Sequence, residues 1–296
     1  MTDQSRHSTP HPIAGLAEIA GRYDAALLDL WGCVHNGVRA FPGACEAMRR
    51  LRASGKKVIV LSNAPRRSDA VASGMAKLGV GGDLYDAVLS SGEVTWRALA
   101  ERSDPWHARL GRRVLHLGPE RDLSLFEGSG IARAPVDHAQ FVLATGPNQD
   151  HMSVDDHQDI LAAAARRHLP MVCANPDLDV IRGEARLICA GALAQCYERL
   201  GGDVRYHGKP HESIYAVAFA LLGGIPRARV LAVGDGVRTD ILGANRAGID
   251  SAFIAGGVHG EELGVAMGDH PDEEIGARLR AEYGASPTYL LPELRW

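Results

Sequence analysis

Apolar residues in this chain gather in short uninterrupted runs, and several of these runs end at a polar residue. The three clearest runs cover residues 25–28, 58–61 and 230–233. Runs of this length without alternation are typical of strands that are covered on both faces, as in parallel sheets. Ligands of open α/β sheets bind beyond the carboxyl ends of the strands. Because Asp29, Ser62 and Asp235 follow these runs, we expect the three side chains to converge on one site.

Segments with helical character separate these strands. The predicted helices cover residues 44–53, 68–78, 211–222 and 239–247. A glycine follows each of them within two residues, and glycine is favoured just past a helix end. Further strands are expected over residues 251–255 and 287–291, the second at an edge of the sheet. The alternation predicts an α/β fold with a Rossmann-like, doubly wound parallel sheet.

The middle of the chain carries its own α/β pattern. Strands are expected over residues 114–117, 141–144 and 170–174. Ser153 and Asp156 resemble a capping box that opens a helix reaching about residue 167. The simplest organisation is a core domain made of residues 1–82 and 204–296. Residues 83–203 then form an inserted α/β domain, placed where loops of the core emerge.

Composition narrows the class of protein. The chain has 296 residues, 46% of them hydrophobic, which is ample for a folded core. A net charge of −4 with both signs mixed provides no basic footprint for nucleic acid. The chain has five cysteines, an odd number, and no C-x-x-C motif. We therefore expect reduced thiols rather than disulfides or metal thiolates.

The sequence also lacks signals for a membrane or for secretion. The longest apolar runs are well short of a membrane span. Residues 1–13 are polar and lack the apolar stretch of a signal peptide, so we expect a frayed start. We therefore expect a cytoplasmic protein with neither a membrane nor a nucleic acid as partner.

The first strand end permits phosphoryl chemistry. A carboxylate such as Asp29 can attack phosphorus and form an aspartyl-phosphate, which divides one difficult step into two. The alternatives are a metal ligand or a residue that caps the loop. The Ser62 hydroxyl and backbone N–H groups near Asn63 can hold phosphate oxygens, although Ser-Asn is also ordinary turn chemistry. Lys209, in a glycine-flanked turn, can stabilise a phosphoryl group, although a solvated surface lysine is the common alternative.

The segment 234–240 is the strongest single motif, because it places two carboxylates around a predicted strand-to-helix turn. Mg²⁺ favours one or two carboxylates together with waters and phosphate oxygens, and Asp235 fits a direct ligand. Asp240 lies near the helix start, where an acidic side chain is stabilised by the helix dipole. Asp240 can therefore be interpreted in two ways: it supports the metal site without binding the ion directly, or it only caps the start of the helix.

In combination these motifs resemble the haloacid dehalogenase superfamily. The match is closest to its class IIA branch, which holds the NagD-like, 4-nitrophenylphosphatase-like and pyridoxal-phosphatase-like enzymes, and it covers about residues 20–260. The motifs that carry the resemblance are Asp29-Leu30-Trp31-Gly32, Ser62-Asn63, Asn175-Pro176-Asp177, Gly208-Lys209-Pro210 and the 234–241 segment with Asp235, Thr239 and Asp240. Each piece is unspecific alone, whereas the ordered set is highly specific.

The resemblance implies a Mg²⁺-dependent hydrolase of small phosphate monoesters, such as sugar phosphates or nucleotides. Asp29 would attack phosphorus, and Mg²⁺ would bind Asp29, Asp235 and the backbone oxygen of Trp31, with support from Asp240. Other implied roles concern the substrate. Ser62, Asn63 and Lys209 would hold the phosphoryl group, and Asn175 and Asp177 would face the substrate from the inserted domain, a C2-type cap. Relatives often form a homodimer through this cap, but the sequence leaves the oligomeric state open.

The chain departs from the family pattern at Trp31, where the usual motif has a second aspartate that protonates the leaving group. An indole cannot exchange a proton at neutral pH. His35 is the nearest candidate substitute as acid and base, and its alternative is a turn histidine beside Asn36 and Gly37. The runner-up function is therefore a regulatory protein that binds a phosphorylated ligand with negligible turnover. An unrelated nucleotide-binding module ranks below both, because the chain has no G-x-x-x-x-G-K-[ST] loop.

Overall fold

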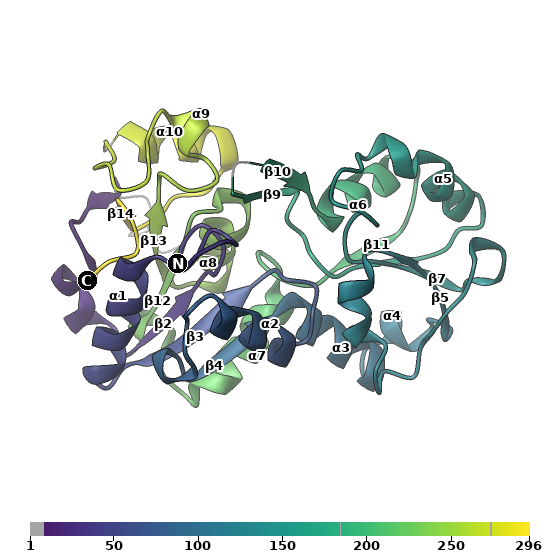
Figure 1. Ribbon diagram of the computed structural model, residues 1–296, viewed down its shortest axis with the longest axis horizontal. Coiled ribbons are helices and arrows are strands. Elements are labelled where there is room, and N and C mark those ends of the chain that lie inside the picture. Colours follow the sequence, from purple (N-terminus) through teal and green to yellow (C-terminus); the bar gives the residue numbers. More distant parts are fainter. Residues whose placement is uncertain (1–8, 184, 273) are drawn as a thin grey trace, which may run out of the picture. The chain divides into compact units, whose positions relative to one another are not determined.

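The computed structural model describes residues 9–183, 185–272 and 274–296, and it divides into two compact units (Figure 1). The first unit takes the chain up to Ser62, Ala72–Val88 and Tyr215–Trp296. The second unit takes Asn63–Val71 and Leu89–Ile214. Compared with the predicted insert of residues 83–203, the second unit also includes segments 63–71 and 204–214, whereas residues 83–88 belong to the first unit. The assignment of a cap role to it remains a prediction.

The first unit is built on a seven-stranded sheet in the order β1-β14-β13-β12-β2-β3-β4. The strands are β1 (His11–Pro12), β2 (Ala25–Leu28), β3 (Lys57–Ser62), β4 (Ala87–Ser90), β12 (Val230–Gly234), β13 (Asp250–Ile254) and β14 (Tyr289–Leu291). Strand β2 pairs in parallel with β3 on one side and with β12 on the other. All residues of β2 and β12 are buried, as the uninterrupted apolar runs predict. The predicted α/β, Rossmann-like fold is confirmed.

Helices connect these parallel strands (Figure 1). They are α1 (Pro42–Ala53), α2 (Ser68–Lys77), α7 (Glu212–Leu222), α8 (Leu242–Ala247), α9 (Gly260–Leu263) and α10 (Glu274–Tyr283). The predicted helix over 239–247 differs in its first turn. There the chain forms a π-helical turn, Val237–Ile241, in which the Ile241 N–H donates to the Gly236 carbonyl at 3.2 Å. Such wide turns are frequent at functional sites.

One edge of the seven-stranded sheet differs from the prediction. Residues 289–291 do form a strand, but β14 is not the edge, because β1 pairs with it in parallel. The His11 N–H donates to the Thr288 carbonyl and the Ile13 N–H to the Leu290 carbonyl, each at 3.0 Å. Residues 11–13 are therefore held by backbone pairing, which a polar composition does not reveal. Residues 1–8 of the segment expected to fray lie outside the described residues.

The second unit has its own five-stranded parallel sheet, in the order β11-β8-β7-β5-β6. Its strands are β5 (Arg113–Leu117), β6 (Ala132–Arg133), β7 (Phe141–Ala144), β8 (Met171–Cys173) and β11 (Val204–Tyr206), and its helices are α3 (Ser91–Glu101), α4 (Pro105–Ala108), α5 (Gln158–Arg166) and α6 (Ala190–Arg199). A separate hairpin pairs β9 (Asp179–Arg182) with β10 (Ala185–Ile188) in antiparallel register. Strand β7 coincides with its predicted range.

Two apolar clusters cover the two faces of this second sheet. Val142 and Ala144 belong to the cluster that includes Leu161 of α5, whereas Phe141 and Leu143 belong to the other cluster. Alternate residues of β7 therefore face different layers, and all four are fully buried. This explains why β7 is a continuous apolar run rather than an alternating one.

The capping box expected before α5 is present in part. The Ser153 backbone N–H and hydroxyl both donate to the Asp156 carboxylate, at 2.7 and 2.8 Å. A 3₁₀ turn, Asp155–His157, follows, and α5 itself begins only at Gln158. Among the residues that the structure describes, no helix combines the length and the apolar character needed to span a membrane.

Candidate active site

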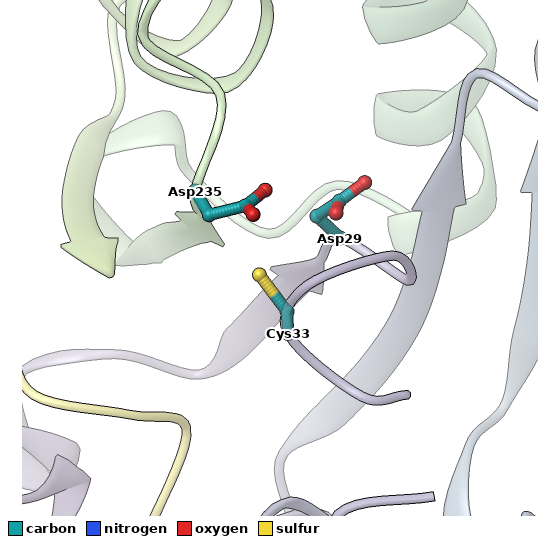
Figure 2. Close-up of side chains that lie close together, drawn as sticks. All are labelled: Asp29, Cys33 and Asp235. Carbon is teal, nitrogen blue, oxygen red and sulfur yellow. The ribbon is translucent and has the colours of Figure 1, made fainter. Parts of the chain in front are cut away.

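Asp29 and Asp235 come together at the carboxyl ends of two neighbouring strands. Strand β2 pairs with β12 up to Leu28 opposite Val233, and the Asp29 N–H then donates to the Val233 carbonyl at 2.8 Å. Carboxylate oxygens of both residues and the Cys33 sulfur all lie within 4.8 Å of one another (Figure 2). Asp29 is 8% exposed and Asp235 is 6% exposed, so the two carboxyl groups share a largely buried site. Such a pair favours a cation between them.

Two glycines leave the space that the Asp235 carboxylate occupies. A Cβ atom on Gly32 would lie 2.0 Å from Asp235 Oδ2, and a Cβ atom on Gly257 would lie 2.2 Å from the same oxygen. Gly32 also has φ +76°, a conformation that side chains rarely adopt. The Val258 N–H donates to Asp235 Oδ2 at 2.8 Å and holds the carboxylate in this orientation. The site therefore has a built cradle for one acidic group.

Asp240 braces the turn that carries Asp235. Its Oδ2 accepts a hydrogen bond from the Gly236 N–H at 3.0 Å, and the side chain is buried. A Cβ atom on Gly234 would lie 2.1 Å from the Asp240 Cγ, so glycine is required there as well. This geometry supports the capping interpretation. Indirect support of a metal through the same turn remains a prediction.

The loop after Asp29 closes on itself within a few residues. The N–H groups of Val34 and His35 both donate to the Leu30 carbonyl, at 2.9 and 3.1 Å. The Trp31 and His35 rings meet edge to face with centroids 4.9 Å apart. His35 is buried, and its Nδ1 accepts from the Gly37 N–H at 3.0 Å, so a neutral imidazole carries its proton on Nε2. His35 thus has a clear structural role in the turn, and its acid–base role remains a prediction.

Cys33 is the site residue that sequence reasoning missed, because the five cysteines carry no ligand spacing of their own. It is 1% exposed, and Figure 2 shows its sulfur directed toward the two carboxylates. The available signal was its position four residues after Asp29. The tight turn after the strand brings a residue at that spacing back over the strand end.

A second cluster joins four of the predicted substrate-binding residues within the second unit. The Asn63 side chain accepts from the Lys209 N–H at 2.8 Å and donates to the Lys209 carbonyl at 3.0 Å. The same amide nitrogen donates to Asp177 Oδ1 at 2.8 Å. Asn175 Oδ1 in turn accepts from the Asp177 N–H at 3.0 Å. Ser62 belongs to the first unit, at the end of β3, so the unit boundary falls between two consecutive predicted phosphate-binding residues.

Gly208 makes this close approach feasible. Its φ is +117°, and a Cβ atom there would lie 2.5 Å from Asn63 Oδ1 and 2.8 Å from the Ser91 Cβ. Lys209 and Asn63 are both nearly fully buried. The G-K-P motif therefore combines a glycine that permits backbone contact with a lysine whose main chain is held by a side-chain amide.

A buried histidine pair lies next to this lysine loop. His107 Nε2 and His207 Nε2 are 3.0 Å apart, and His107 Nδ1 contacts the Asp104 carboxylate. Because a carboxylate only accepts, a neutral His107 holds its proton on Nδ1 and accepts from His207 through Nε2. Burial lowers the pKa of His207 to about 3 and also lowers the pKa of His107. The pair is therefore neutral at physiological pH.

Comparison with known proteins identifies the family. Residues 26–132 match the model of haloacid dehalogenase-like hydrolases, and residues 206–281 match a second, HAD-hydrolase-like model. Chronophin of Mus musculus is 30% identical over 83% of this chain and 85% of its own length. A haloacid dehalogenase-like hydrolase from Brucella suis has 36% identity and a TM-score of 0.83, covering 95% of this chain and 99% of that one. The magnesium complex of a Mycobacterium tuberculosis glycerol phosphate phosphatase has 26% identity and a TM-score of 0.67, covering 92% and 76%.

The fold, the ordered motifs and these relatives agree. The chain belongs to the haloacid dehalogenase-like hydrolases, and the resemblance predicted from its motifs is confirmed. It is an enzyme of the hydrolase class. The individual roles of its site residues remain proposals.

Proposed function

We propose that this protein is a Mg²⁺-dependent phosphatase that cleaves small phosphate monoesters through an aspartyl-phosphate. The observation that carries the proposal is the convergence of Asp29 and Asp235 at adjacent strand ends, with oxygens of both within 4.8 Å. Sugar phosphates, nucleotides and related small esters form the substrate class. A relative named for its action on glycerol phosphate supports this choice.

The donor set fits a hard divalent cation. Mg²⁺ is bound through one or two carboxylates together with waters and phosphate oxygens. Asp29, Asp235 and the Trp31 backbone oxygen would hold it, and Asp240 would keep the Asp235 turn in place. When bound, the ion supplies charge stabilisation for the transferring phosphoryl group. The glycine cradle around Asp235 supports this fit, because the carboxylate is held in one orientation before any ion binds.

The reaction then follows from the residues of the chain. An Asp29 oxygen attacks phosphorus, the ester P–O bond breaks, and the leaving oxygen takes up a proton. Water next attacks the phosphorus of the aspartyl-phosphate, which releases inorganic phosphate and restores the Asp29 carboxylate. Ser62, Asn63 and Lys209 would position the phosphoryl group, and Asn175 and Asp177 would contact the rest of the substrate. Positioning and charge stabilisation dominate such transfers.

The tryptophan at position 31 is the observation that favours a second candidate function, the binding of a phosphorylated ligand without turnover. General acid–base assistance contributes about 10²–10⁴-fold in rate, and an indole cannot provide it. A protein that lacks this assistance can still bind a phosphorylated ligand and act as a regulator with negligible turnover. His35 would restore the assistance only if its Nε2 reaches the leaving oxygen.

A panel of phosphate esters, assayed with and without Mg²⁺, separates the two functions. We expect hydrolysis that requires Mg²⁺ and disappears in Asp29→Asn. Asp24→Asn is a matched control, because Asp24 lies just before the same strand, where it pairs with Arg229 away from the site. Saturable phosphate-ester binding without turnover would favour the regulatory function. Hydrolysis that survives Asp29→Asn would reject the aspartyl-phosphate.

A further inference from the structure

We propose that Asp29, Cys33 and Asp235 together form a mixed oxygen–sulfur site that binds thiophilic divalent cations, Zn²⁺ or Cd²⁺, in competition with Mg²⁺. The inference rests on the proposed function only in placing a cation between the two carboxylates. It adds a third side-chain donor, and it predicts that the protein distinguishes soft from hard metals by this one side chain.

The positions of the three donors suit one ion. One oxygen of each carboxylate and the Cys33 sulfur all lie within 4.8 Å of one another. Zinc–oxygen bonds of about 2.0–2.2 Å and zinc–sulfur bonds of about 2.3 Å place donors in one shell roughly 3–4.5 Å apart. Small side-chain rotations therefore close the three atoms around a shared cation. All three residues belong to the first unit.

The backbone holds Cys33 in this position. The Val34 N–H donates to the Leu30 carbonyl and the Gly32 N–H to the His35 carbonyl, both at 2.9 Å. These bonds flank Cys33 on both sides and fix the turn that directs its sulfur toward the carboxylates (Figure 2). Cys33 is 1% exposed, so the sulfur faces the interior of the site rather than solvent.

The chemistry of the donor set determines the preference. Mg²⁺ takes hard oxygen ligands and gains nothing from a thiol, whereas Zn²⁺ and related ions bind thiolates strongly. On binding, the Cys33 thiol releases its proton to solvent as the sulfur–metal bond forms, and no electron is transferred. The same ion occupies the two carboxylates that the proposed phosphatase reaction needs. A thiophilic cation therefore acts as an inhibitor at concentrations well below those of Mg²⁺.

The test follows thiolate bonding directly. Cd²⁺ is titrated into the full chain while the ultraviolet charge-transfer band of cadmium thiolates is recorded, and Zn²⁺ and Mg²⁺ affinities are measured by calorimetry. We expect one equivalent of Cd²⁺ to produce the band and excess Mg²⁺ to suppress it. Cys33→Ser and Cys33→Val should abolish the band and weaken Zn²⁺ binding at least tenfold, with less than a twofold change for Mg²⁺. Cys45→Ser, which removes a partly buried thiol of α1, should leave all three readouts unchanged.

The outcomes are distinct. No band in the parent protein, or a band that persists in Cys33→Ser and Cys33→Val, would overturn the inference. Circular dichroism of both variants shows whether the fold is retained, and the two substitutions differ in polarity so that a folding failure of one leaves the other to decide. A protein that shows the band but hydrolyses no phosphate ester would reject the proposed phosphatase and leave this site standing. Mg²⁺-dependent hydrolysis without the band would overturn the mixed oxygen–sulfur site and leave the proposed phosphatase standing.

Discussion

The side-chain amide of Asn63 pairs with both main-chain groups of Lys209, a residue 146 positions away. It accepts from the Lys209 N–H at 2.8 Å and donates to the Lys209 carbonyl at 3.0 Å, as a neighbouring strand would. Because the pair is buried, no water replaces these bonds if the amide is lost. The backbone of the proposed phosphate-binding lysine therefore depends on a side chain from the preceding motif.

We expect Asn63→Ala to impair both stability and phosphate binding. It removes one buried hydrogen bond from each main-chain group of Lys209, and a buried polar group that loses its partner costs about 1–3 kcal/mol. The free energy of unfolding should fall and the inhibition constant of inorganic phosphate should rise. Asn36→Ala is the control, because the Asn36 side chain accepts from the Val38 and Arg39 N–H groups in an exposed turn. An unchanged inhibition constant in a folded Asn63→Ala protein would contradict a positioning role.

Replacing Trp31 tests the missing proton donor. We expect Trp31→Asp to raise kcat, by up to about 10²-fold, because it supplies a carboxylic acid where the indole cannot donate a proton. Trp31→Phe should give no gain, since it only changes the size of the ring. The measurement is kcat on a phosphate ester at saturating Mg²⁺. If Trp31→Asp gains nothing while Mg²⁺ affinity is preserved, another residue already fills the role, and His35→Gln then becomes the informative variant.

Gly257→Ala should weaken metal binding without unfolding the protein. The added methyl group would lie 2.2 Å from Asp235 Oδ2 and 2.3 Å from the Asp235 Cβ, so the carboxylate must move. We expect at least a tenfold loss of Mg²⁺ affinity by calorimetry. Gly74→Ala is the matched control: Gly74 lies in α2 with no atom within 4 Å of an added Cβ, and alanine favours helices. Equal Mg²⁺ affinities in both variants would show that the cradle does not orient a ligand.

The buried histidine pair predicts a pH dependence of stability. The pKa of His207 falls from 6.5 to about 3 on folding, so the unfolded chain binds its proton more readily. The free energy of unfolding is therefore unaffected by this group above pH 6.5 and decreases as the pH falls from there toward 3. At pH 5 the loss from His207 amounts to about 2 kcal/mol.

Urea unfolding at pH 7.5 and pH 5 measures this loss. Several groups face His207 and enter the same balance, namely His107, His211, Asp104 and Arg205. Comparison with His207→Gln cancels most of their contribution, because glutamine keeps a polar partner for His107 but does not titrate. We expect a smaller decrease in His207→Gln, whereas His138→Gln, an exposed control, should follow the parent protein. Identical decreases in all three proteins would contradict a neutral buried His207.

Local sequence pattern was sufficient for the central strands of both sheets and for the family. Uninterrupted apolar runs such as 141–144 mark strands because burial on both faces removes any need for polar alternation. The ordered motifs around Asp29, Lys209 and Asp235 identified the class of hydrolase, because that chemistry requires those residue types at strand ends. Each of these signals spans only a few consecutive residues, so it can be recognised without knowing the path of the chain.

Only the tertiary structure revealed which distant side chains meet. Three contacts could not be predicted from neighbouring residues in the sequence. They are the Cys33 sulfur beside two carboxylates, the hydrogen bonds of Asn63 to Lys209, and the contact of His107 with His207. Strand β1 likewise exists because β14 offers backbone partners, although its own residues are polar or proline. Such contacts depend on strand register, on the course of each turn and on side-chain rotation. These are settled jointly by packing over the whole fold, which is why no single segment of sequence encodes them.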